Sequence, residues 1–151
     1  MFLSLSFLII LCFILIFSVL LSVYDIRNFS VPLWGLILGM VGLLAFRIIL
    51  YTNTVYLYII SAAILTLIYF LVKLITRGKL GTGDILFGLF QGLGFRPQFI
   101  WICLLVEAVT GLIFFLFRHY RKGNSSETKK MPFIPFMASG LFISFICDCF
   151  L

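Results

Sequence analysis

The sequence predicts an all-α integral membrane protein, a bundle of about six transmembrane helices in which the fourth is short. Of its 151 residues, 64% are hydrophobic and only 11% are charged, and the mean hydropathy is +1.27. A soluble core of this length could not bury so much apolar surface, which excludes an ordinary soluble domain. The length leaves room for about six spans with short loops, so we expect a single transmembrane domain over residues 1–151.

Six apolar runs follow one another, at residues 2–23, 33–50, 55–74, 85–95, 99–117 and 133–150. Charged, small polar, Pro or Gly residues separate them at 25–32, 51–54, 76–83, 96–98 and 118–130, and such residues end helices. The first run lacks a basic segment and a small-residue cleavage site, so we expect a retained anchor. The fourth run is too short to span a bilayer alone. We expect a half-helix packed inside the bundle, or a helix extended with help from Gly88, Gly92 and Gly94.

Basic residues predict the orientation, because Lys and Arg are retained on the cytoplasmic side of a bilayer. If all six runs cross, only Arg47 and Arg96 fall on one face. The other face carries Arg27, Lys73, Arg77, Lys79, Arg118, Arg121, Lys122, Lys129 and Lys130. The segments that hold Asp25 and Asp84 then both face the cytoplasm. The net charge of +6 therefore indicates topology and attraction to anionic membrane lipids, and nucleic-acid binding is not expected.

Two aspartates stand at the edges of apolar runs, Asp25 in Tyr-Asp-Ile-Arg and Asp84 in Gly-Thr-Gly-Asp. An ionisable group at membrane depth is costly, so its presence indicates function. Two carboxyl groups that share a site repel each other, and one then keeps its proton while the other ionises. Such a pair can activate water and polarise a peptide carbonyl without a metal or another cofactor.

The residues before Asp84 suggest how a substrate would approach it. We expect Gly81 and Gly83 to permit positive φ angles and close approach of an extended substrate strand. Asp84 would lie near a helix amino terminus, where the dipole favours the ionised form, although the sequence leaves open which aspartate carries the proton. Taken singly, Asp84 could be a helix cap and Asp25 could form an ion pair with Arg27. Their joint placement on one face favours a shared site.

Three blocks of the sequence together resemble the type 4 prepilin peptidase family, which are GxGD membrane aspartyl proteases. The first block is Asp25-Ile26-Arg27 followed by Val31-Pro32, and the second is Gly81-Thr82-Gly83-Asp84. The third is Met131-Pro132-Phe133-Ile134-Pro135-Phe136-Met137-Ala138, similar to the family's Pro-Phe-Gly-Pro-Phe-Leu-Ala block. Their order and spacing extend over nearly the whole chain, which supports the resemblance more than any block alone.

The resemblance implies that Asp25 and Asp84 are the catalytic pair and that Arg27, Gly81 and Gly83 bind substrate or shape its loop. The implied substrates are pilin-like precursors of type IV pilus or secretion systems, cut at the cytoplasmic face of the inner membrane between a short basic leader and a hydrophobic helix. The chain has no cysteine-containing methyltransferase segment, so we expect a peptidase only. It departs from the family at Leu33, Leu86 and Ile134, where Asn, Lys and Gly are usual, which bears on substrate range.

Three more residues are candidates for a supporting role. Glu107 lies in the middle of an apolar run, where an acid must be protonated, paired or facing a polar cavity; a structural hydrogen bond and a functional role both stay open. Pro132 and Pro135 are expected mainly to start the last helix. The alternative function is a non-catalytic transporter or assembly scaffold, in which the same acids relay protons or hold helices together. The two halves of the sequence show no internal repeat, and this counts against a transporter.

Overall fold

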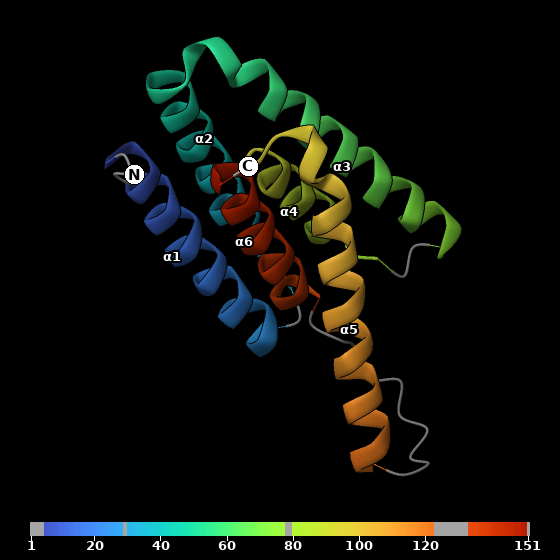
Figure 1. Cartoon of the computed structure of the whole chain (residues 1–151). Coiled ribbons are helices and arrows are strands. Elements are labelled where there is room, and N and C mark those ends of the chain that lie inside the picture. Colours follow the sequence, from blue (N-terminus) through green and yellow to red (C-terminus); the bar gives the residue numbers. More distant parts are fainter. Residues whose placement is uncertain (1–4, 29, 78–79, 123–132, 151) are drawn as a thin grey trace.

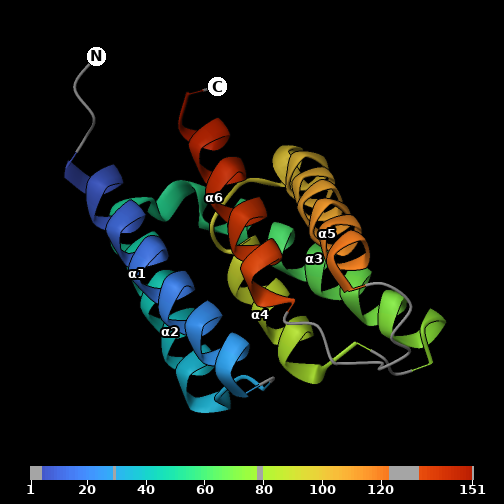
Figure 2. The ribbon, with the colours of Figure 1, turned by 90° about the horizontal axis from the view of Figure 1, so that it is seen from below.

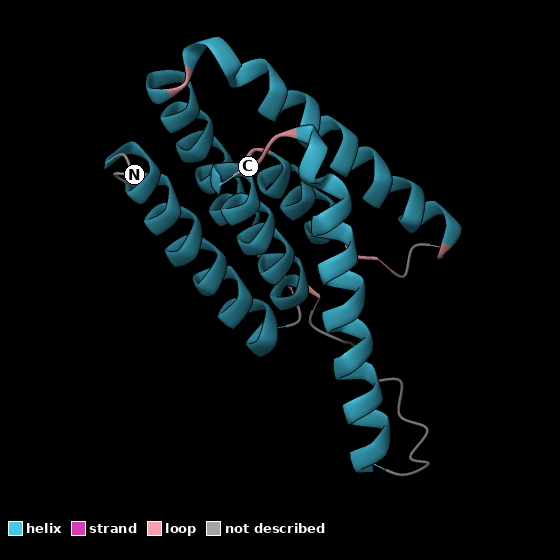
Figure 3. Cartoon of the chain, in the orientation of Figure 1, coloured by secondary structure: helices cyan, strands magenta, loops and turns pink. Residues whose placement is uncertain are grey.

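The computed structural model describes residues 5–28, 30–77, 80–122 and 133–150. Figure 1 shows the helices, and Figure 3 shows that the described residues form helices and loops without a strand. The helices are α1 (Leu5–Asn28), α2 (Leu33–Leu50), α3 (Val55–Ile75), α4 (Thr82–Gly92), α5 (Ile100–Lys122) and α6 (Ile134–Phe150), with short 3-10 helices η1 (Thr52–Thr54) and η2 (Pro97–Phe99). The predicted all-α fold is confirmed.

Four helical stretches are long and apolar enough to cross a membrane. They are Phe7–Asn28, Leu33–Leu50, Thr52–Ile75 and Pro97–Phe117. The helix α6 is apolar but shorter, and α4 has only 11 residues, about 16 Å of helix at the usual rise. The short fourth helix is thus confirmed, and the chain is an all-α membrane protein.

Successive helices alternate in direction through the bundle (Figure 1). As a result, α1 ends where α4 and α6 begin, and we call this the site end of the bundle. The opposite end, where α2 and α4 finish, is called the far end. The short α4 packs against α2, α3 and α6, and α6 packs against α1 and α5 as well. In the view of Figure 2, α4 lies between the α1–α2 pair and the α3–α5 pair.

The packing around α4 depends on glycine. A Cβ atom on Gly92 would lie 2.3 Å from the Cα of Ala62 in α3, and one on Gly88 would lie 2.2 Å from the Tyr69 ring. Small residues at such crossings let helix backbones approach closely, which is how helices pack where lipid is the solvent. Two further residues of α4, Phe87 and Phe90, are fully buried. The short helix is therefore fixed by close contact with its neighbours.

The predicted boundaries are right for α2 and wrong in part for three other helices. α1 continues to Asn28 through the predicted break at 25–32, because the first residue in that segment that disfavours a helix is Pro32. α5 continues to Lys122, since Arg, His, Tyr and Lys are all compatible with helix and the first glycine comes at position 123. α4 begins at Thr82 and ends at Gly92, three residues earlier at each end than predicted.

Candidate functional site

Asp84 lies in the first turn of α4, at the site end. Gly81 precedes the helix in an extended conformation, and its backbone N–H donates a hydrogen bond to Asp84 Oδ2 over 3.0 Å. This bond satisfies one of the amide groups that every helix start leaves without an intrahelical partner. The expectation that Asp84 lies near a helix amino terminus is confirmed, and the bond fixes one of its carboxyl oxygens.

Asp25 lies in the last two turns of α1 and is 5% exposed. Its Oδ2 accepts a hydrogen bond of 3.2 Å from the backbone N–H of Ile134, the first residue of α6. The carboxyl group therefore joins α1 to α6 through two residues that are 109 positions apart in sequence. This contact also brings the first motif block against the third.

Gly83 brings the second block against the first. A Cβ atom at Gly83 would lie 3.0 Å from Val31 Cγ2 and 3.1 Å from Val31 Cβ, so the start of α4 rests directly on the segment between α1 and α2. The three blocks that carry the family resemblance therefore meet at the site end. Asp25 and Asp84 belong to this one meeting point.

The environment of Asp84 changes its acidity. Burial raises the pKa of Asp84 from its ordinary value to about 6; the charge of nearby Asp25 raises it as well, and the Gly81 hydrogen bond lowers it. The predicted preference of a helix start for ionised Asp84 is thus outweighed by burial. Asp84 therefore keeps its proton to a higher pH than an exposed aspartate does, and the charge of Asp25 is one of the causes.

The conformational role predicted for the two glycines is wrong. Gly81 has φ −66° and ψ 151°, and Gly83 lies inside the helix. Non-glycine residues adopt both conformations freely. What the structure requires at these positions is space: a Cβ at Gly81 would lie 3.1 Å from Asp84 Oδ2. The glycines keep the Asp84 carboxyl group and the Val31 segment uncrowded.

Two of the other predicted site residues, Arg27 and Pro135, lie at helix ends. Arg27 is exposed in the last turn of α1, where a cation interacts favourably with the helix dipole. Pro135 is the second residue of α6, as expected of a helix start, whereas Pro132 lies outside the described residues. In the described part of the chain no group of three His, Cys, Asp or Glu side chains could hold a metal ion.

Glu107 lies deeper in the bundle, in α5, and is 5% exposed. Its Oε2 contacts the Tyr69 hydroxyl at 2.5 Å, and its Oε1 accepts from the Gln91 amide and from the Cys103 thiol. Gln91 and Tyr69 are absent from the sequence-based candidates. The glutamine was detectable as a polar residue inside the fourth apolar run, whereas a tyrosine in an apolar helix carries no distinct signal.

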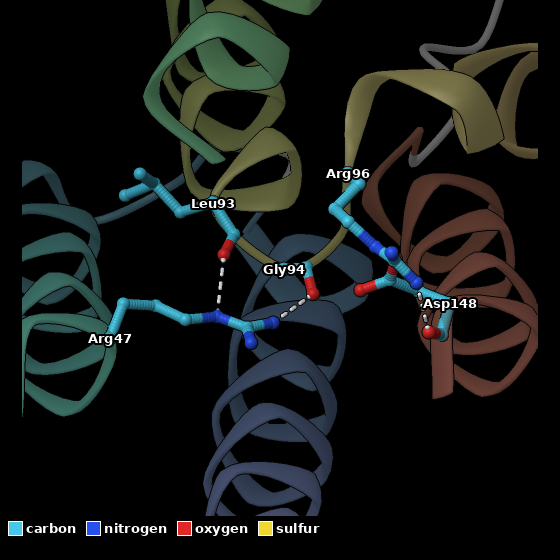
Figure 4. A network of polar contacts seen from close by, with 5 residues as sticks. All are labelled: Arg47, Leu93, Gly94, Arg96 and Asp148. Carbon is cyan, nitrogen blue, oxygen red and sulfur yellow. Dashed lines mark hydrogen bonds and ion pairs between the residues drawn. The ribbon is translucent and has the colours of Figure 1, made fainter. Parts of the chain in front are cut away.

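A second polar centre lies at the far end, and Figure 4 shows it from close by. Arg47 of α2 is 3% exposed; its Nε donates to the Leu93 carbonyl over 3.3 Å and its Nη2 donates to the Gly94 carbonyl. Arg96 forms an ion pair with Asp148 of α6. These two carbonyl groups belong to the residues that directly follow α4, and Arg47 gives both of them a donor. The two basic residues that oppose the charge bias are thus both engaged in internal contacts.

Replacing Arg47 should loosen the far end of α4. We expect Arg47→Met to destabilise the protein by about 1–3 kcal/mol, because the Leu93 and Gly94 carbonyls would stay buried without a donor. Arg47→Lys should have a smaller effect, since an ammonium group can still donate but cannot span both carbonyls in the same way. Thermal unfolding in detergent micelles, followed by circular dichroism, measures both. Equal stability of the three proteins would refute this role.

Comparisons of the chain with protein-family models, with curated proteins and with solved structures give no match.

Proposed function

We propose that this chain is a membrane-embedded aspartyl endopeptidase of the prepilin peptidase type. It removes the short basic leader from type IV pilin-like precursors at the cytoplasmic face of the inner membrane. Asp25 and Asp84 are the catalytic pair, and Gly81, Gly83 and Arg27 shape the place where the substrate backbone lies. No metal or other cofactor takes part in the proposed reaction.

The observation that carries this proposal is the convergence of the three motif blocks. Residues far apart in sequence meet through the Ile134 N–H bond to Asp25 and through the contact of Gly83 with Val31. The charge of Asp25 also acts on Asp84. A scaffold or a transporter gives no reason for these motifs to meet around two carboxyl groups, whereas an aspartyl peptidase requires it.

The chemistry follows from the mutual repulsion of the two groups. One carboxyl group is ionised and takes a proton from the attacking water, while the other keeps its proton and hydrogen-bonds the scissile carbonyl oxygen. The proton is then available for the leaving amine. The pKa of about 6 for Asp84 keeps a proton in the pair closer to neutral pH than two exposed aspartates could.

The substrate fits the arrangement of the helices. The hydrophobic helix of a precursor would lie in the bilayer against apolar outer faces of the bundle, such as those of α1 and α5, where Ile16, Leu105 and Leu112 are exposed. Its leader junction would then reach the site end, at the depth where α4 starts. The first turn of α4 holds Asp84 at this same end of the bundle.

Reconstitution tests the proposal directly. The purified chain is placed in liposomes with pilin-like precursors that carry a basic leader, and the products are identified by mass spectrometry. We expect one cut, between the leader and the hydrophobic helix. A precursor whose junction residues are replaced by a continuous apolar helix serves as the control and should stay intact. If every authentic precursor also stays intact in lipids that preserve the fold, the non-catalytic scaffold becomes the better account.

A further inference from the structure

A buried polar cluster joins four helices deeper in the bundle than the proposed site. It contains Tyr69 of α3, Gln91 of α4, and Cys103 and Glu107 of α5, all of them buried. Gln91 Nε2 contacts Glu107 Oε1, and it donates to the Met137 carbonyl of α6 over 2.9 Å. Among the described residues no basic side chain forms an ion pair with Glu107. An uncompensated carboxylate at this depth would be costly.

Counting hydrogens within the cluster shows how that cost is avoided. The Tyr69 hydroxyl lies 2.5 Å from Glu107 Oε2 and 3.2 Å from Gln91 Oε1, two atoms that only accept hydrogen bonds when Glu107 is ionised. One hydroxyl carries one hydrogen, so it can serve only one of them. Both contacts become hydrogen bonds if Glu107 carries a proton: Glu107 donates to Tyr69, and Tyr69 donates to Gln91.

The Gln91 amide then closes the circle by donating back to Glu107 Oε1. Every member donates to the next, and the ring carries no net charge. The second amide hydrogen of Gln91 goes to the Met137 carbonyl, which ties α6 to the same residue. The Cys103 thiol also lies 2.8 Å from Gln91 Nε2, but it needs no amide hydrogen because it donates its own to Glu107 Oε1. A closed neutral ring satisfies all of these polar atoms, and fully satisfied buried networks fix a unique packing.

Two glycines make room for the ring. A Cβ atom at Gly140 of α6 would lie 2.7 Å from Glu107 Cγ, and a Cβ atom at Gly88 of α4 would lie 2.2 Å from Tyr69 Cδ2. Gly88 stands one helical turn after Asp84, and Gln91 stands two turns after it, so all three share one face of α4. The ring thus contacts the face of α4 on which Asp84 lies.

We propose that Tyr69, Gln91 and a protonated Glu107 form a closed hydrogen-bonded ring that sets the position of α4, and with it the position of Asp84. The three side chains are positioning residues, since none of them touches the proposed substrate. Only the link to catalysis rests on the proposed peptidase function. The ring itself and the placement of α4 are testable in a protein that cuts nothing.

The decisive variant is Glu107→Gln. An amide resembles a protonated carboxyl group, because it has a donor group and an acceptor oxygen in the same places, so the ring can re-form with Gln at position 107. Glu107→Met and Tyr69→Phe keep the approximate volume and remove a link. We expect Glu107→Gln to unfold at about the wild-type temperature, and Glu107→Met and Tyr69→Phe to unfold about 5 °C lower or more. If Glu107→Gln unfolds as early as Glu107→Met, the ring with a protonated Glu107 is refuted.

Infrared spectroscopy reads the protonation directly. At neutral pH the wild-type protein should show a carbonyl-stretch band of a protonated carboxylic acid that is lost in Glu107→Gln. Identical spectra of the two proteins in this region would overturn the assignment, whatever their stabilities.

The placement of α4 is measured with two spin labels, at Ser30 before α2 and at Thr82 in the first turn of α4, both exposed. Cys12, Cys147 and Cys149 are replaced by serine so that only the introduced cysteines react. We expect one narrow distance distribution in the parent and in Glu107→Gln, and a shifted or broadened one in Glu107→Met and Tyr69→Phe. An unchanged distribution in both ring-breaking variants would refute the positioning role.

Cleavage of a precursor adds the final comparison. Glu107→Gln should keep most of the wild-type rate, and Glu107→Met should lose at least tenfold in turnover with a smaller change in KM. If the wild-type chain cuts no precursor, the proposed function fails while the spectroscopic tests still decide the ring. If the wild type cuts and Glu107→Met cuts equally fast, the ring has no part in positioning Asp84.

Discussion

Asp25→Asn and Asp84→Asn are each expected to lower the rate of precursor cleavage by about 10³-fold or more, as losses within a unit of catalytic groups do. An amide neither takes a proton from water near neutral pH nor gives one to a carbonyl oxygen. The pair then lacks its base or its acid, and the remaining aspartate cannot fill both roles. Initial rates of leader release in liposomes measure the effect.

The fold should survive both changes, which separates chemistry from structure. Asparagine keeps a carbonyl oxygen that can accept from the Ile134 N–H at position 25, or from the Gly81 N–H at position 84. The unfolding temperatures of the two variants should therefore stay close to that of the wild type. Asp25→Ala is the informative contrast, because it removes the acceptor too and should also reduce stability. Undiminished cleavage by either asparagine variant would eliminate that residue from the pair.

The second large effect is expected from Gly92→Ala, a change of one methyl group. Its Cβ would lie 2.3 Å from Ala62 Cα and 2.5 Å from Ala62 N, and backbone atoms cannot move aside as a flexible side chain can. The helices α3 and α4 must separate, which should cost about 3 kcal/mol, at the upper end of the usual overpacking cost. Thermal unfolding in micelles measures the stability, and cleavage should fall because α4 carries Asp84.

Gly111→Ala is the matched control for this substitution. It makes the same change in α5, where the added Cβ would have no atom within 4 Å apart from its chain neighbours and the nearby backbone of its own helix. Alanine is the better helix former by about 1 kcal/mol, so this variant should be as stable as the wild type or slightly more so. If the two alanine variants are equally stable, α3 and α4 do not pack as closely at Gly92 as described here.

The helical framework could be predicted from the sequence because hydropathy and helix breakers act locally. The bounds of α2 follow from Pro32 on one side and the polar segment after Leu50 on the other. Where no breaker stands, the prediction stopped too early: Asp25 reads as the start of a loop, but charged residues in the final turns of a helix are tolerated. Asp25 and Asp84 were found because carboxyl groups are conspicuous in an apolar chain.

The contacts that assemble the site could not be predicted in the same way. Asp25 is bound by a backbone N–H, and every residue except proline carries one, so the sequence gives no sign of this partner. The sequence suggests that Gly88 and Gly92 help to extend α4, whereas in the structure they make room for Tyr69 and Ala62. Glu107 was recognised as unusual, but its ring partner Tyr69 lies in a different helix, and only the tertiary structure brings them together.

The claim that Asp25 and Asp84 share one site at one membrane face is tested most directly by labelling from the two sides of the membrane. Single cysteines are placed at Arg27 and Thr82, near the two aspartates, and at Gln98 near the far end; all three positions are exposed. A membrane-impermeant thiol reagent is applied to intact cells and to inverted vesicles. We expect Arg27→Cys and Thr82→Cys to react only in the inverted vesicles and Gln98→Cys only in intact cells. Labelling of Arg27→Cys and Thr82→Cys from opposite sides would contradict the shared site and the peptidase proposed on it.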